Sequence, residues 1–255
     1  MKKFYIIANW KMKLNFQESI ELFNEIKQNF LEKNQAEIVV CPSYVPLFEI
    51  NKNNIDRKIK LGGQDVFWEE TGAYTGEISC EMLEDVGCEY VIIGHSDRRK
   101  YFKETDEMAH YKVKTALKSS LTPILCVGEN FQERQENRKD YVIISQITKA
   151  LSGIDFSGSE KMIIAYEPVW VIGSGQAIKP EDAEYMHQII KQTLIDIFPI
   201  EIVEKCFKII YGGSINAGVV KNFLIQPNIW GVLVGSDSLN SKKFIDIIRE
   251  VNTIK

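Results

Sequence analysis

The stretch from Ile163 to Gly175 reads IIAYEPVWVIGSG. It begins as a short apolar run, typical of a buried strand, and the run ends at a carboxylate, Glu167. An apolar segment and two glycines, Gly173 and Gly175, follow. A short run without polar alternation favours a parallel sheet that is covered by helices, because such a strand is buried on both faces.

The same pattern recurs along the chain, and this recurrence indicates the fold class. The apolar runs are FYIIAN, EIVVCP, KLGGQD, YVIIGH, TPILCVG, MIIAYEP, FKIIYGG and IWGVLVGS. Between them lie segments with helical periodicity, for example FQESIELFNEIKQNFLEK and EDAEYMHQIIKQTLIDIF, the second preceded by Pro180. Eight such strands alternating with helices predict an α/β protein: a closed, parallel, eight-stranded (β/α)8 barrel ringed by helices.

A doubly wound open sheet is the structural alternative. No G-x-G-x-x-G motif follows the first apolar run, which speaks against that fold. The sequence also has no linker, low-complexity segment, charge block or obvious repeat. We therefore expect one domain over residues 1–255.

Composition and charge narrow the classes of function. The chain has 255 residues, of which 45% are hydrophobic and 26% charged, and its formal net charge is -4. This balance gives no reason to expect nucleic acid or an anionic membrane as a partner. The apolar run in MKKFYIIANWK is too short for a signal peptide or a membrane span, so we expect a cytoplasmic location. Five cysteines without a C-x-x-C pair predict reduced, mostly buried thiols: Cys41, Cys80, Cys88, Cys126 and Cys206.

Polar residues follow nearly every apolar run. In a parallel barrel the carboxyl ends of the strands gather on one face, where active sites form. Asn9, Lys11, His95 and Glu167 follow three different runs. We therefore expect these four side chains to meet there.

Glu167 is the first candidate for catalysis. A lone glutamate more often caps a helix or forms a salt bridge. The segment after it carries Trp170 and Ile172 between permissive glycines, so it could close as a lid and exclude water. Since burial penalises the charged carboxylate and strengthens it as a base, we predict that Glu167 is a general base under this lid.

His95 is one of three histidines and precedes SDRRKYF, a candidate short helix. A helix N-terminus disfavours imidazolium, so a neutral ring could donate a hydrogen bond to a carbonyl and move a proton. His110 and His187 lie in helical stretches and are assigned to the surface. No H-x-H or H-E-x-x-H pattern is present, so a catalytic metal is not expected.

The remaining strand ends suggest how an anion could be held. Lys11 is either a solvated lysine or a fixed positive charge for an anionic substrate. YGGSI and LVGSDS place small residues after the last two runs, where backbone N–H groups of barrels often bind phosphate. Each glycine pair alone is a weak signal, and its position in the barrel strengthens it.

Taken together, these motifs closely resemble those of the triosephosphate isomerases over essentially the whole chain. NWKM, GAYTGEIS, IGHSDRR, CVGE, AYEPVWVIGSG, YGGSI and GVLVGS occur in the order and at the spacing of that family. The resemblance implies a TIM barrel and an isomerase of glycolysis and gluconeogenesis that needs no metal or cofactor. It also implies the interconversion of dihydroxyacetone phosphate and D-glyceraldehyde 3-phosphate through an enediol or enediolate.

The resemblance also implies roles for single residues. Glu167 is similar to the family's base, His95 to its neutral electrophile, and Lys11, beside Asn9, to its electrostatic anchor. The positions that match its phosphate-binding backbone are Gly173, Ser214, Gly235 and Ser236, and Ile172 and Leu233 match the apolar pair that presses on the base.

The resemblance further implies a homodimer. The segment from Val66 to Ser79 is similar to the family's interdigitating loop, in which Thr75 reaches the site of the partner subunit. Met12 stands where some members have an interface cysteine.

Several residues depart from the family's common pattern. Asp97 replaces a glutamate, and its shorter side chain predicts a long or water-bridged ion pair with Lys11. Ser236 replaces a glycine, and Asp237 places a negative charge beside the phosphate site, where like charges would repel. In the lid, Val171 replaces a small residue, and the hinge Gln176-Ala177-Ile178 lacks the usual lysine.

Two other functions stay open at this point. The first is a Schiff-base aldolase that uses Lys11, which would require a desolvated lysine. The second is a barrel without catalytic activity that acts as a binding or scaffold protein. The set Asn9, Lys11, His95 and Glu167 fits proton transfer better than either.

Overall fold

The structure is a computed structural model that describes residues 2–29, 36–172 and 178–254. Within these residues eight parallel strands close into a barrel in the order β1-β2-β3-β4-β5-β6-β7-β8. The strands are β1 (Phe4–Asn9), β2 (Ala36–Cys41), β3 (Lys60–Gly63), β4 (Cys88–Ile93), β5 (Thr122–Val127), β6 (Met162–Tyr166), β7 (Phe207–Tyr211) and β8 (Gly231–Val234). Each begins within two residues of a run that the sequence predicted, so the predicted barrel is confirmed.

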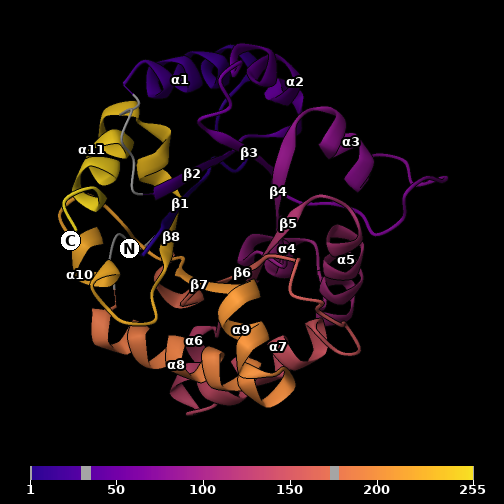
Figure 1. The fold of residues 1–255 in the computed structure, drawn as a ribbon, viewed down its shortest axis with the longest axis vertical. Coiled ribbons are helices and arrows are strands. Elements are labelled where there is room, and N and C mark those ends of the chain that lie inside the picture. The colour runs from indigo at the N-terminus through magenta and orange to yellow at the C-terminus, as the bar shows by residue number, and fades with distance from the viewer. Residues whose placement is uncertain (1, 30–35, 173–177, 255) are drawn as a thin grey trace.

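Helices surround this sheet on the outside (Figure 1). They are α1 (Phe16–Gln28), α2 (Tyr44–Asn53), α3 (Cys80–Asp85), α4 (Ser96–Tyr101), α5 (Asp106–Lys118), α6 (Phe131–Gln135), α7 (Lys139–Ala150), α8 (Pro180–Ile197), α9 (Ile200–Cys206), α10 (Val220–Leu224) and α11 (Ser241–Val251). Two 3₁₀ turns, η1 (Val169–Val171) and η2 (Ser236–Leu239), follow β6 and β8.

Local sequence signals explain where these helices start. Asn15 and Glu18 form a capping box at the start of α1, each side chain accepting a hydrogen bond from the backbone N–H of the other residue. Pro180 is the first residue of α8 and is followed by two acidic residues, as the sequence predicted. These starts fix the connections between strands and helices.

Alternate strand residues point to opposite sides of the sheet and form two separate cores. The inner core fills the barrel with Ile7, Val39, Cys41, Tyr90, Ile92, Ile124, Cys126, Ile163, Ala165, Ile210 and Leu233. The larger outer core lies between sheet and helices and includes Ile6, Phe23 and Phe244. Because side chains fill the barrel, only its rim can form a site. The five cysteines are all buried, as predicted.

One connection leaves the barrel. The segment between β3 and α3 projects away from the sheet and its helices (Figure 1). Its residues 71–77 are exposed. Among the described residues, no helix is long and apolar enough to cross a membrane.

Candidate active site

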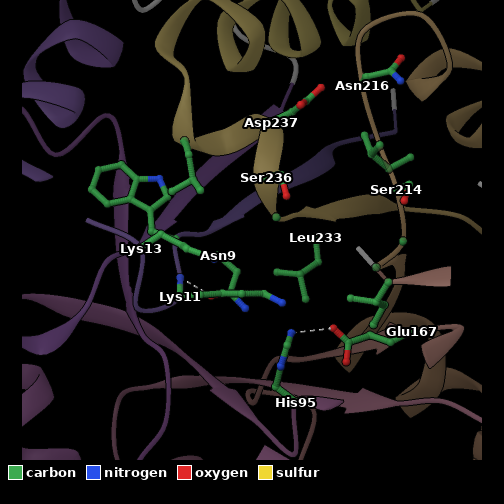
Figure 2. Close-up of a pocket in the computed structure, with 17 residues that line it drawn as sticks. Asn9, Lys11, Lys13, His95, Glu167, Ser214, Asn216, Leu233, Ser236 and Asp237 are labelled. Carbon is green, nitrogen blue, oxygen red and sulfur yellow. Dashed lines mark hydrogen bonds and ion pairs between the residues drawn. The ribbon is translucent and has the colours of Figure 1, made fainter. Parts of the chain in front are cut away.

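A cavity of about 440 Å³ opens at the carboxyl ends of the strands. Asn9, Lys11, His95 and Glu167 line it, although they follow β1, β4 and β6. His95, Glu167 and Lys11 lie together on one side, and Ser214 and Ser236 lie across from them (Figure 2). The cavity therefore has a side that carries titratable groups and a side of small residues.

Lys11 occupies a tight turn just after β1. Its φ of 53° is in the left-handed region, which a side chain rarely adopts. Two polar side chains hold this turn: Asn9 Oδ1 accepts from the Lys11 N–H at 3.0 Å, and Gln64 Nε2 donates to the Lys11 carbonyl at 2.9 Å. These bonds fix the point from which the ammonium reaches into the cavity.

The ammonium of Lys11 forms an ion pair with Asp97. Lys11 Nζ lies 2.9 Å from Asp97 Oδ2, so the expectation of a long or water-bridged pair is wrong. The turn at Lys11 and the position of Asp97 in the first turn of α4 bring the groups together without the extra methylene. Burial raises the pKa of the Asp97 carboxyl, but Lys11 and His95 lower it, and its pKa lies below the ordinary value.

His95 lies where β4 turns into α4. It is the N-cap of that helix, and its Nδ1 accepts from the Asp97 N–H at 3.0 Å. A ring nitrogen that accepts carries no proton, so the proton of the neutral ring is on Nε2. Nε2 lies 3.1 Å from Glu167 Oε1 and points into the cavity (Figure 2). The ring therefore offers one N–H donor to whatever occupies this side.

Glu167 follows β6 and is buried, with 3% of its surface exposed. Its other oxygen, Oε2, accepts from the Ser96 N–H at 3.1 Å. Burial raises the pKa of Glu167, but His95, the Ser96 N–H and Lys11 lower it, so its pKa lies below the ordinary value. The expectation that burial alone makes Glu167 a stronger base is therefore wrong for this arrangement, in which two donors stabilise the carboxylate.

The backbone of Glu167 is packed tightly against β5. The Glu167 N–H donates to the Val127 carbonyl at 2.8 Å. A Cβ at Gly128 would lie only 1.7 Å from the carbonyl oxygen of Glu167. Gln146 on α7 holds Gly128 on both sides, accepting from its N–H at 2.9 Å and donating to its carbonyl at 3.2 Å. Glycine is the only residue type that fits this contact.

The opposite side of the cavity is lined by Ser214, Gly235 and Ser236. Asp237, next to them, also lines the cavity, and Lys243 on α11 lies 3.2 Å from its Oδ1. This ion pair partly offsets the repulsion that the sequence predicted between Asp237 and an anion. Sequence reasoning did not select Lys13 and Asn216, which line the rim as well.

Two apolar side chains, Ile172 and Leu233, line the cavity beside Glu167. Leu233 lies between the two sides in Figure 2. The segment before Ile172 is tied to Glu129, which is fully buried and accepts from Trp170 Nε1 at 3.0 Å. Gly173, assigned to phosphate binding, and the predicted hinge residues Gly175, Gln176 and Ala177 lie outside the described residues.

Thr75 does not reach the cavity of this chain. Thr75 lies in the exposed part of the projecting segment and is absent from the residues that line the cavity. Within the segment, the Phe67 ring packs at a tilt against the rings of Trp68 and Tyr74, with centroids 4.1 and 4.6 Å apart. These contacts tie the exposed residues around Tyr74 to the start of the segment.

Of the other two histidines, His187 differs from the sequence interpretation. His187 is fully buried in α8, so its assignment to the surface is wrong; its Nδ1 lies 2.7 Å from the Ala183 carbonyl. Burial lowers the pKa of His187 to about 4. His110 is half-buried, with Nδ1 3.1 Å from the Ala150 carbonyl. In the part of the chain that is described, no group of three or more His, Cys, Asp or Glu side chains could hold a metal ion.

Comparison with known proteins agrees with this arrangement. The family model described as triosephosphate isomerase matches residues 4–251. The triosephosphate isomerase of Dictyoglomus turgidum is 45% identical over 249 residues, which is 98% of this chain and 100% of that protein. Those of Dictyoglomus thermophilum and Alkaliphilus oremlandii are 44% and 41% identical and cover 98% and 97% of this chain, with 100% and 99% of their own lengths matched. On these matches, which span nearly the whole barrel, the chain belongs to the triosephosphate isomerase family.

Proposed function

We propose that Glu167, His95 and Lys11 interconvert dihydroxyacetone phosphate and D-glyceraldehyde 3-phosphate in this chain, as an isomerase of glycolysis and gluconeogenesis. One observation carries the proposal. The Glu167 carboxylate and the His95 Nε2–H lie 3.1 Å apart beside the Lys11 ammonium, in a cavity whose opposite side is lined by small residues. A base, a neutral donor and a fixed cation are the groups that proton transfer next to a carbonyl requires.

The substrate binds with its phosphate at the small residues. The N–H groups around Ser214, Gly235 and Ser236 are the proposed donors, since backbone N–H groups can surround an anion where side chains are small. The carbonyl then lies next to His95 and Lys11. Asn9 supports this end by holding the turn at Lys11.

The proton moves in two steps. Glu167 takes a proton from one of the two carbons that carry oxygen and returns it to the other. His95 Nε2 gives its proton to the carbonyl oxygen and takes the proton of the neighbouring hydroxyl, so that the hydroxyl and the carbonyl exchange places. Before it can act, Glu167 must leave the His95 and Ser96 N–H groups that now stabilise it. Loss of these donors raises its basicity. Ile172 and Leu233 line its path and exclude water.

A test of these roles is the Glu167→Gln variant in an assay coupled to the consumption of either triose phosphate. We expect kcat to fall by about 10²–10⁴-fold, the usual contribution of a positioned base, while a non-reacting phosphorylated analogue still binds. Glu184→Gln is the matched control, because Glu184 on α8 is also buried but accepts from Asn228 and does not line the cavity. Activity of Glu167→Gln within twofold of the parent would reject Glu167 as the base.

The aldolase alternative is disfavoured by the ion pair of Lys11. Lys11 Nζ lies 2.9 Å from the Asp97 carboxylate and its side chain is 28% exposed, whereas a Schiff-base lysine is activated by an apolar pocket or a neighbouring cation. Borohydride treatment with substrate present should therefore leave Lys11 unlabelled.

We infer further that the protein is a cytoplasmic homodimer, with the whole of residues 1–255 in one domain. Support for the dimer comes from apolar side chains that are exposed in the projecting segment 66–79, in the turn after β1 and at the start of α2. Met12 is 93%, Val45 75% and Tyr74 45% exposed. Large apolar side chains that are exposed in this way are candidates for a protein interface. In the dimer, Thr75 would support Asn9 and Lys11 of the partner subunit.

A further inference from the structure

The peptide groups on both sides of Gly94, directly before His95, are held by two charged side chains. Gly94 is the first residue after β4, and its φ of 71° lies in the left-handed region. Its N–H donates to Glu104 Oε1 at 2.9 Å, and its carbonyl accepts from Arg99 Nε at 2.7 Å. Neither side chain lines the cavity.

Glu104 is fixed by two further contacts. Its other oxygen, Oε2, accepts from Arg98 Nε at 2.5 Å and from Lys112 Nζ at 2.9 Å. Only 5% of Glu104 and 3% of Lys112 is exposed. Burial raises the pKa of Glu104, but Lys112 and Arg98 lower it, so its pKa lies below the ordinary value and it is a carboxylate. Charge-assisted bonds in a buried place leave this carboxylate little freedom to move.

A second carboxylate in the same cluster allows a comparison. Asp65 pairs with the same two cations: its Oδ1 lies 2.6 Å from Lys112 Nζ, and its Oδ2 lies 2.8 Å from Arg98 Nη2. Among the hydrogen bonds of the described residues, the Gly94 N–H bonds Glu104 and not Asp65. If the cluster only stabilises the fold, removing either carboxylate should therefore have the same effect on kcat. If Glu104 also determines where His95 lies, removing Glu104 should lower kcat more than removing Asp65.

We propose that Glu104 is a positioning residue for His95: through the Gly94 N–H it sets the backbone from which the His95 ring meets Glu167. Arg99 fixes the other side of Gly94 by donating to its carbonyl oxygen. His95 Nε2 is the proposed donor to the substrate carbonyl, and a shift of the backbone at Gly94, which Glu104 and Arg99 hold by hydrogen bonds, would move this nitrogen. A displacement of about 1 Å near reacting groups can cost on the order of 10²-fold in rate. The inference rests on the proposed role of His95.

The test compares Glu104→Gln with Asp65→Asn. Each change keeps the shape and removes one carboxylate from the same two cations. In Glu104→Gln the amide oxygen turns to Lys112 and Arg98, which leaves its NH2 group facing the Gly94 N–H, donor against donor. We expect kcat to fall at least about tenfold with KM within about twofold, and the NMR signal of the His95 Nε2 proton to shift. In Asp65→Asn, thermal stability should fall similarly, while kcat and the His95 signal stay near those of the parent.

Two outcomes overturn the inference: an equal loss of kcat in both variants, or no loss in Glu104→Gln. If either variant does not fold, Arg99→Lys and its control Asp106→Asn decide by the same criteria. Lysine lacks the Nε–H that reaches the Gly94 carbonyl. Asp106→Asn leaves that bond in place and removes the ion pair with Arg99 Nη1 at 2.6 Å, together with the longer pair with Lys149 at 3.6 Å. His95→Gln is assayed alongside. Parent-like activity there would reject the proposed role of His95 itself, whatever Glu104→Gln shows.

Discussion

The ion pair between Lys11 and Asp97 gives a prediction whose size follows from the geometry. The two groups are 2.9 Å apart, and their side chains are 28% and 41% exposed. Two unit charges at this distance in bulk water attract by about 1.4 kcal/mol. Pairs with this much exposure retain about 0–1 kcal/mol, because solvent screens them and ordering the side chains costs entropy. We therefore expect Asp97→Asn to lower kcat/KM by about two- to fivefold.

Two parts of the site should survive this change. The Asp97 N–H, which donates to His95 Nδ1, belongs to the backbone and remains. The turn at Lys11 is held by Asn9 and Gln64, independently of Asp97. Asp97→Glu should bring no gain in kcat/KM, because the existing pair is direct and leaves no gap for an extra methylene to close.

The assay is steady-state kinetics of Asp97→Asn, Asp97→Glu, Lys11→Met and the double variants, at low and high salt. The loss from Asp97→Asn should shrink at high salt and disappear when Lys11 is already methionine, as a double-mutant cycle measures. A gain of more than about threefold in Asp97→Glu, or a loss in Asp97→Asn that persists without Lys11, would refute the reasoning.

Three further predictions concern other parts of the molecule. Asp237→Asn should lower KM for the triose phosphates by about two- to fivefold, because it removes a negative charge that lines the cavity; Asp246→Asn, whose partner on α11 is Arg249, should leave KM unchanged in the same assay. The buried His187 has a pKa of about 4 in the fold against about 6.5 in the unfolded chain, so the unfolded chain binds the proton first as the pH falls. The free energy of unfolding should thus drop by up to about 3 kcal/mol between about pH 6.5 and 4, and in urea titrations His187→Gln should flatten this dependence while His110→Gln keeps it. Shortening the exposed residues 71–77 should give monomers of low activity by light scattering, and a monomeric parent protein would contradict the proposed dimer.

The fold was predictable because every strand carries its own signal. Runs such as those around Ile7 and Ile164 are buried on both faces, and each is short, apolar and followed by a polar or glycine-rich end. The convergence of Asn9, Lys11, His95 and Glu167 follows from the same property, since parallel strands all end on one face. Both the barrel and the meeting of these four side chains could therefore be predicted from one sequence.

The features that sequence reasoning missed depend on how side chains pack in three dimensions, which the spacing of residues along the chain does not show. His187 has the periodicity of a helix, and only packing decides which face of that helix is covered. The direct pair of Asp97 with Lys11 depends on a backbone φ of 53°, which the residue type lysine does not signal. Gln64 followed the general rule of polar residues at strand ends and could have been selected on that ground.

Gly128 shows how a position without a side chain can limit the evolution of a catalyst. With the Glu167 carbonyl 1.7 Å from where its Cβ would be, any substitution there must push the strand that carries the base. Residues on the rim, such as Ser236 and Asp237, face the cavity, so substitutions there change the lining that a substrate meets. In a randomised library, diversity therefore belongs on the rim, while codon 128 is best left fixed. A designer who wants another base on this scaffold must replace the residue at 167 and keep the glycine that faces it.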